Sequence, residues 1–248
     1  MCAVRALVYD ATAALLSRVG EHALAWTAAD RALAAAENSG EPLLTAAGAW
    51  RLSYVLTGRE RPRQGLELAM TAAHAVERTM RSASAAQLSI YGALHLAAAT
   101  AAAAAHDHAA SRALLHQAQI TAEWFGKDAN LMGTAFGPVN VAIHRMSVAL
   151  RFGDAHTAVE VGETLGGASL PPGLIGRRAQ LCLDLARGYT IRRQDAAAVN
   201  MLLAAERTSP QLVRFDQVTS DVLTSLLRRE HRPSTPQLRP LARRAGVI

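Results

Sequence analysis

The sequence predicts an all-α protein, a right-handed superhelical solenoid of about five helix pairs followed by a capping helix. Three observations support this fold class. Half of the residues are hydrophobic but only 4% are aromatic, and the many alanines among them are typical of closely packed helices. Gly and Pro punctuate the chain at intervals, with long stretches between them that contain neither. A short turn followed by a polar helix start recurs along the chain.

Each recurring turn places a Gly or polar residue before the start of a helix. The turns lie about 38, 48, 47 and 41 residues apart, near the lengths of two-helix repeats. Apolar residues at helical spacing flank each turn, so each interval holds two antiparallel helices. Stacking such pairs covers apolar faces that one pair alone leaves exposed. The turns are Gly20-Glu21, Gly58-Arg59, His106-Asp107, Gly153-Asp154 and Gln194-Asp195.

The first pair is predicted at Ala3–Val19 and Glu21–Asn38. Gly40 and Pro42 end it, because Gly accepts a left-handed cap and Pro cannot continue a helix. The longest break is Gly126–Pro138, and Gly166–Gly173 ends the fourth pair. The second to fifth pairs are predicted at Leu43–Thr57 and Arg63–Arg78, Ala86–Ala105 and Ala109–Phe125, Val139–Phe152 and Ala155–Leu165, and Leu174–Arg192 and Ala196–Arg207.

The C-terminal part is predicted to differ from the repeats. A capping helix at Leu212–Arg229 closes a repeat domain of residues 1–230, and residues 231–248 form a basic tail with one short helix at Leu238–Ala245. The net charge is +6, and nearly all of the excess lies after residue 225. The body therefore has no basic stripe, which argues against direct nucleic-acid binding.

Several functional classes lack their sequence signatures. The two cysteines, Cys2 and Cys182, form no disulfide framework, so a reduced, cytoplasmic setting is expected. No stretch is long and apolar enough for a membrane span. No nucleophile, phosphate-loop or zinc-protease motif occurs. His106, His108 and His116 lack ligands that would complete a metal site, so neither a metal nor a cofactor is expected.

Three segments resemble one protein family. They are His22–Leu33 (HALAWTAADRAL), Thr134–His144 (TAFGPVNVAIH) and the Arg-Ala-Gly-Val ending. They are similar to the C-terminal tetratricopeptide regions of XRE-type helix-turn-helix transcriptional regulators from high-G+C Gram-positive bacteria. The resemblance implies tetratricopeptide-like helix pairs and the sensor half of a regulator. Because the first repeat helix follows Met1 almost at once, DNA binding is not carried over to this chain.

Two pairs of residues are the candidate binding site. Asn140 and His144 lie four residues apart and share one helix face, and the Asn side chain offers both a donor and an acceptor to an amide. Tyr91 and His95 form a second such pair. Both pairs belong to first helices, which line the concave side of a solenoid. The alternative for Asn140 and His144 is that they satisfy the ends of neighbouring helices or the Gly-rich loop. For Tyr91 and His95 it is ordinary packing, the role that we assign to Trp50 and Tyr54.

The predicted function is therefore a binding module that senses a peptide or small molecule on the concave face. Two alternatives stay open. One is a self-associating scaffold, a homodimer formed through a solenoid end or through Val222, Leu223, Leu226 and Leu227. The other is a small-molecule pocket recruited as an enzyme in specialised metabolism. In each case the partner is a peptide, a small molecule or another protein.

Overall fold

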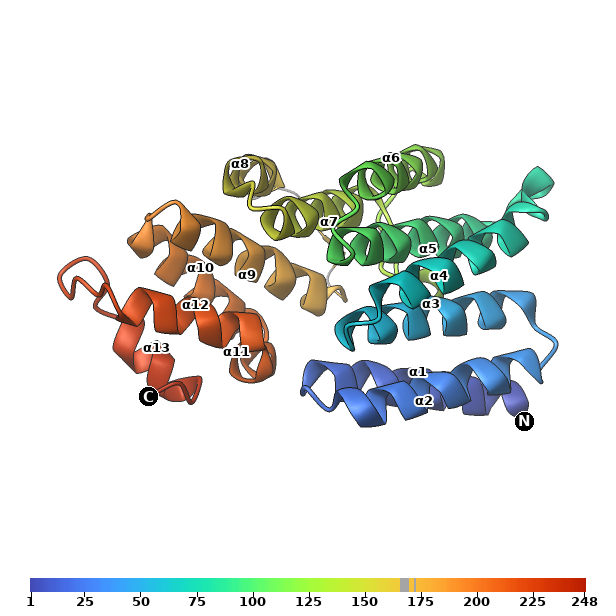
Figure 1. Ribbon diagram of the computed structural model, residues 1–248, viewed down its shortest axis with the longest axis horizontal. Coiled ribbons are helices and arrows are strands. Elements are labelled where there is room, and N and C mark those ends of the chain that lie inside the picture. The colour runs from blue at the N-terminus through green and yellow to red at the C-terminus, as the bar shows by residue number, and fades with distance from the viewer. Residues whose placement is uncertain (166–169, 172) are drawn as a thin grey trace. The chain divides into compact units, whose positions relative to one another are not determined.

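The computed structural model describes residues 1–165, 170, 171 and 173–248, without the side chain of Arg81. Over these residues the chain is all helical, and helices that follow one another in sequence pack together (Figure 1). No helix in the described part is both long and apolar enough to cross a membrane. The predicted break at Gly166–Gly173 lies largely outside the described residues.

The chain divides into two compact units. Unit 1 comprises Met1–Ser17 and Glu21–His144, and unit 2 comprises Arg18–Gly20 and Arg145–Ile248. The boundary between His144 and Arg145 falls within a helix. Unit 1 contains α1 (Cys2–Arg18), α2 (His22–Glu37), α3 (Pro42–Gly58), α4 (Pro62–Glu77), α5 (Ala85–Ala104), α6 (His108–Phe125), the 3-10 helices η1 (Met80–Ser82) and η2 (Leu131–Gly133), and the start of α7 (Pro138–Arg151).

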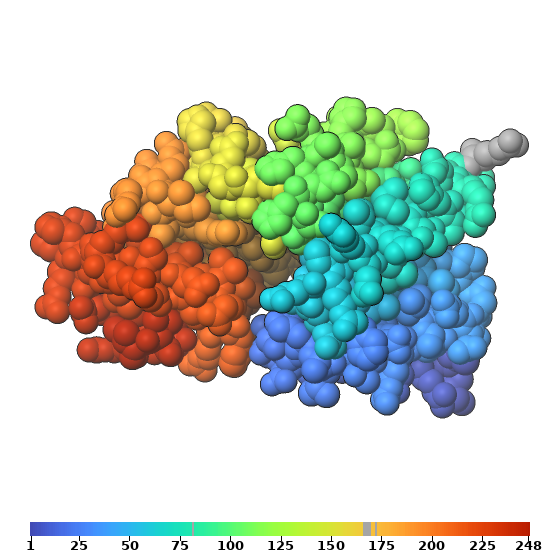
Figure 2. All heavy atoms as spheres, in the orientation of Figure 1, coloured from blue at the N-terminus to red at the C-terminus, as the bar shows by residue number. Residues whose placement is uncertain are grey.

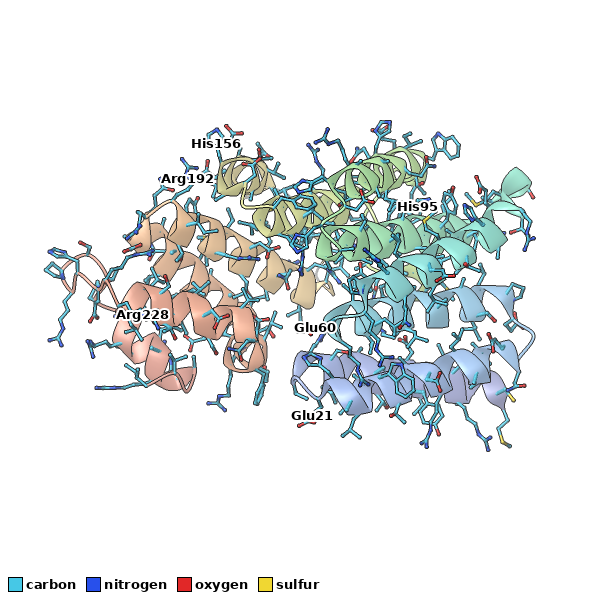
Figure 3. All side chains as sticks on the ribbon, viewed as in Figure 1. Glu21, Glu60, His95, His156, Arg192 and Arg228 are labelled. Carbon is cyan, nitrogen blue, oxygen red and sulfur yellow. The ribbon has the colours of Figure 1, made fainter. Side chains whose placement is uncertain are left out.

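Unit 2 contains the end of α7 and the helices that follow it. These are α8 (Ala155–Leu165), α9 (Ile175–Ile191), α10 (Asp195–Thr208), α11 (Pro210–Phe215), α12 (Gln217–Leu227) and α13 (Leu238–Arg244). The pair α9–α10 forms the centre of this unit, and α8, α11 and α12 pack against it. The labelled His156 and Arg192 lie at the start of α8 and just after α9 (Figure 3).

Five helix pairs are joined by the same backbone turn. One residue in each turn is left-handed, with φ between 61° and 83°, and the next residue's amide donates to the carbonyl five residues earlier at 2.9 Å. This is the hydrogen bond of a Schellman motif, which satisfies carbonyls at the end of the first helix. The left-handed residues recur at intervals of 40, 46, 47 and 40, and they are Gly20, Glu60, His106, Gly153 and Arg193.

The recurring turn was therefore predicted correctly in three of five pairs. In the second pair the turn lies two residues after the predicted Gly58, and in the fifth it lies one residue before Gln194. Figure 3 shows Glu21, just before α2, and Glu60, in the α3–α4 turn, at the same edge of unit 1. The same turn thus recurs five times at intervals of 40 to 47 residues.

The core of unit 1 is built around α5. This helix packs against α3, α4 and α6 and is buried on nearly all sides, because Ala and Gly at most positions let its neighbours approach closely. Its start is fixed by a capping box, in which Ser84 and Gln87 satisfy each other's backbone amides. One continuous hydrophobic cluster joins α3, α4, α5 and α6 to the beginning of α7.

The C-terminal part of unit 2 differs from its prediction. The expected capping helix is two helices, because Asp216 is extended and its carboxylate accepts from the Thr219 amide at 2.7 Å, which starts α12. The basic tail contains the short helix that was predicted, α13, and this helix is packed, since Leu238 and Leu241 are fully buried in the same cluster as α9 and α10. Arg244 also donates two hydrogen bonds of 2.7 Å to Glu206 on α10.

Candidate functional site

The first turn of α7 is positioned by the segment that precedes it. Gly137 has a φ of 157°, and a Cβ at this position would lie 2.5 Å from the Asp128 Cα atom. The Asp128 carboxylate accepts a hydrogen bond from the Val139 amide at 3.1 Å. Burial raises the pKa of the Asp128 carboxyl, and hydrogen bonds from the Val139 and Asn140 amides oppose part of this rise. Asp128 therefore caps α7 from outside the helix.

His144 links α7 to α3. Its Nδ1 atom lies 2.8 Å from the Asn140 carbonyl oxygen, and because a carbonyl only accepts, Nδ1 carries a proton. Its Nε2 atom lies 2.9 Å from the Tyr54 hydroxyl. In the neutral imidazole Nε2 is an acceptor, so the hydroxyl donates to it. His144 is buried, and the two helices are thus joined by a hydrogen bond between residues 90 positions apart.

Trp50 and Tyr54 provide the α3 side of this arrangement. Their rings pack edge to face, with centroids 5.7 Å apart and planes at 89°, a favourable aromatic geometry. The Arg51 guanidinium lies 4.6 Å from the Trp50 ring centroid and is paired with Asp10 at 2.8 Å. Trp50 is buried in the core of unit 1. The sequence assigned Trp50 and Tyr54 to packing alone. In the structure Tyr54 also forms a hydrogen bond with the candidate residue His144.

Tyr91 and His95 contact each other on α5, but their other partners lie elsewhere. Their ring centroids are 4.4 Å apart, and His95 Nδ1 donates to the Tyr91 carbonyl at 2.9 Å. Burial lowers the pKa of His95. Burial and then the charge of Glu77 raise the pKa of Tyr91, whose hydroxyl also interacts with Gln117. Glu77 and Gln117 belong to α4 and α6, which are second helices of their pairs.

The structure thus separates the two predicted pairs by their partners. His144 bonds Tyr54 of α3, whereas Tyr91 and His95 interact with α4 and α6. All four side chains are buried, and His95 is labelled on α5 in Figure 3. That both pairs line one groove stays a prediction. The candidate site reduces to Trp50 and Tyr54 on α3 with Asn140 and His144 on α7.

Two polar atoms of this site have no hydrogen-bond partner. They are Trp50 Nε1 and Asn140 Oδ1, the only such buried side-chain atoms in the described part of the chain. Trp50 lies one helical turn before Tyr54 on α3, and Asn140 lies one helical turn before His144 on α7. Leaving a buried polar group unpaired costs about 1–3 kcal/mol, so each atom needs an explanation. One is a donor and the other an acceptor, the complement of an amide group.

Sequence reasoning missed a second polar group, in unit 2. Asp184 on α9 accepts hydrogen bonds from the Ser147 hydroxyl on α7 and from Gln180 Nε2 at 3.0 Å. Burial raises the pKa of Asp184 to about 6, against the opposing effects of these two donors and of Arg187. The spacing of Gln180 and Asp184, four residues apart on one helix face, was the available signal.

The described residues contain no group of three or more His, Cys, Asp or Glu side chains that could hold a metal ion. His106 occupies the left-handed position of the α5–α6 turn, and His108 begins α6. Burial raises the pKa of the Cys182 thiol, which disfavours the reactive thiolate. Compared with known proteins, the sequence matches no family model and no curated protein.

Proposed function

We propose that this chain is a tetratricopeptide-like binding module that recognises an amide group, in a peptide or a small molecule, between α3 and α7 of unit 1. One observation carries the proposal: Trp50 Nε1 and Asn140 Oδ1 are buried without partners in the same pair of helices. A ligand carbonyl accepts from the indole, and a ligand N–H donates to the Asn140 oxygen. Each new bond removes part of the cost of an unpaired group.

Ligand entry requires α3 and α7 to move apart, because Trp50 and Asn140 are buried. That movement breaks the hydrogen bond between Tyr54 and His144. The ligand then favours the state in which the two helices are separated, and it shifts the population by its differential affinity for that state. Binding is thus coupled to a change in the spacing of helix pairs, which is what a sensor needs.

The resemblance to the sensor regions of XRE-type regulators fits this proposal. On this basis the protein acts as the ligand-responsive part of a cytoplasmic regulator, with its five helix pairs arranged as a right-handed superhelical solenoid. The identical turns at intervals of 40 to 47 residues support such a repeat. A peptide is the ligand that presents amide donors and acceptors in a fixed alternation.

The proposal is tested with N-acetyl amino acid amides and the matching methyl esters as probes, using isothermal titration of the full chain. We expect an amide to bind and its ester, which lacks the N–H, to bind about 5- to 150-fold more weakly, the equivalent of about 1–3 kcal/mol. Asn140→Leu is expected to lose amide binding while remaining about as stable as the wild type, because the substitution removes an unpaired buried oxygen.

Asn200→Leu is the matched control. Asn200 lies exposed on α10 in unit 2, so this variant makes the same chemical change far along the chain from the candidate site. It is expected to bind the amides as the wild type does. Amide binding that is equal in the wild type and in Asn140→Leu would remove Asn140 from the site, and equal affinity for amides and esters would refute amide recognition.

A further inference from the structure

The outer face of α1 is unusually apolar for an exposed helix. Val4, Leu7, Val8 and Leu15 are each more than half exposed, with exposed fractions of 64%, 57%, 58% and 62%. The opposite face of α1 is also apolar, since Ala6 and Ala13 are buried against the rest of unit 1. One stripe therefore serves the core of unit 1, and the other is left for a partner.

The exposed stripe has the spacing of a coiled-coil seam. Val4, Val8, Ala11 and Leu15 follow one another at steps of four, three and four residues, the alternation of a and d positions in a heptad. Leu7 widens the stripe on one side. Such a seam packs against another helix at a crossing angle of about 20°, so the expected partner is a helix with the same pattern.

The stripe is also symmetric about its centre. When two copies of α1 pack antiparallel, Val4 faces Leu15 of the other copy and Val8 faces Ala11. The same residues then meet on both sides of a twofold axis, as an isologous interface requires. The larger Val8 packs against the smaller Ala11, so the central layer interlocks without two bulky side chains meeting.

Charge does not oppose this pairing. The one acidic residue of α1, Asp10, is held by Arg51 at 2.8 Å within the same chain. Arg5 and Arg18 are exposed at the two ends of the helix. Antiparallel pairing places Arg18 opposite Met1 and not opposite Arg5, so no two charged side chains face each other across the seam, and the Arg18 guanidinium and the Met1 α-ammonium approach only at its exposed ends. The seam therefore does not need an oppositely charged partner, and a second copy of α1 can fill this role.

The available area is sufficient for a specific dimer. α1 and α2 form one end of unit 1, away from α5 and α6, and the blue atoms in Figure 2 lie at its surface. A helix of 17 residues is roughly 25 Å long. Two such helices paired along their apolar stripes bury on the order of 1,000–1,400 Å² in total, which reaches the range of specific interfaces.

We infer that two copies of this chain associate through α1, antiparallel, by the stripe of Val4, Val8, Ala11 and Leu15. Of the two surfaces considered from the sequence, α1 belongs to the first, an end of the repeat. Of the Leu-rich residues at the C-terminal end, Val222, Leu223 and Leu226 are buried within unit 2. They pack against α9, α10 and α13 and are not available to a second copy. Self-association by α1 leaves the α3–α7 site out of the interface.

The test is sedimentation equilibrium of the full chain with two charged variants. Val4→Glu and Leu15→Lys each place an unpaired charge in the seam, and each alone is expected to weaken self-association by about 100-fold or more. Mixed together they are expected to restore a heterodimer, because antiparallel packing places position 4 of one chain opposite position 15 of the other. In a parallel dimer the two charges would not meet.

Leu24→Glu is the control, since Leu24 is 56% exposed on α2, outside the stripe. It is expected to leave association unchanged, and circular dichroism of all variants is expected to match the wild type because the altered side chains are exposed. The inference would be overturned by a wild-type chain that stays monomeric up to a protein concentration of about 200 µM, since an interface of this size is expected to associate below that concentration. It would also be overturned by a dimer that Val4→Glu does not weaken, or by a mixture of Val4→Glu and Leu15→Lys that stays monomeric.

Discussion

Gly92→Ala is expected to lower the free energy of unfolding of unit 1 by about 3 kcal/mol, the upper part of the usual range for overpacking a core. The reason is the Phe136 ring, which lies directly on Gly92. A Cβ at this position would lie 1.9 Å from the Phe136 Cζ atom. Phe136 is fully buried and is held against Phe125, with ring centroids 5.8 Å apart. The ring therefore has no free space to move into.

Urea denaturation followed by tryptophan fluorescence measures this effect, because Trp26, Trp50 and Trp124 all belong to unit 1. Gly58→Ala is the matched control. Gly58 ends α3 with open space around it, so alanine there is expected to be neutral or to stabilise by up to about 1 kcal/mol. A Gly92→Ala variant within about 0.5 kcal/mol of the wild type would contradict the packing argument.

A double variant tests whether the destabilisation by Gly92→Ala comes from its steric conflict with Phe136. Phe136→Leu alone leaves a cavity and is expected to destabilise, but it also shortens the side chain that meets Gly92. Gly92→Ala combined with Phe136→Leu is therefore expected to cost clearly less than the sum of the two single changes. Additive effects would show that the two positions do not interact.

The same contact shows where sequence reasoning stopped. The segment Gly126–Pro138 was identified as the longest break between helices, and its Gly and Pro content made that prediction sound. Nothing local indicated that Phe136 from this segment enters the core against α5. Its partner Gly92 lies 44 positions earlier, and no periodicity connects the two.

The turns illustrate a finer limit. Glycine marked the α1–α2 and α7–α8 turns correctly, because it takes a left-handed conformation without strain. In the α3–α4 turn the left-handed residue is Glu60, and Gly58 is the last residue of α3. The Schellman hydrogen bond from Arg61 to Leu56 selects that position, and it tolerates a non-glycine residue. The preference of glycine for turns predicted that a turn exists, while the Schellman hydrogen bond determines which residue is left-handed.

The candidate site was predicted in part for the same reason. The pair Asn140 and His144 was found from spacing on one helix, which is local. Its connection to Tyr54 depends on two helices that are neighbours only after folding. Burial was also beyond reach, because the sequence analysis expected these polar side chains on a first helix to face a groove, whereas both are buried.

Asp184→Asn is expected to stabilise unit 2 at neutral pH and to remove a pH dependence that the wild type shows. The Asp184 carboxyl is buried between α9 and α7, and burial raises its pKa from 3.8 to about 6. Ser147 and Gln180 donate hydrogen bonds to it, and the nearby charges of Arg187 and Asp216 act in opposite directions, yet the effect of burial is larger than these contributions. Ionising this group in the folded protein is therefore unfavourable.

The direction in which stability changes with pH follows from the pKa values of Asp184 in the folded and unfolded states. Between pH 4 and 6 the folded state holds a proton on Asp184 that the unfolded state has released, so stability falls as pH rises through this window. Above the folded pKa both states are ionised and the whole penalty is present. The shift from 3.8 to about 6 corresponds to a penalty on the order of 2–3 kcal/mol at pH 7. At pH 4 and below, the penalty is nearly absent.

Far-UV circular dichroism during urea denaturation, at several pH values from about 4 to 7.5, measures this difference. Because other carboxylates also titrate there, the quantity to compare is the stability of Asp184→Asn minus that of the wild type. This difference is expected to grow with rising pH and to level off above pH 6, since asparagine keeps the shape of the side chain but cannot ionise. Asp221→Asn, at an exposed carboxylate on α12, is expected to show no such rise. A constant difference for Asp184→Asn across the range would mean that the buried carboxylate is stabilised as an anion after all.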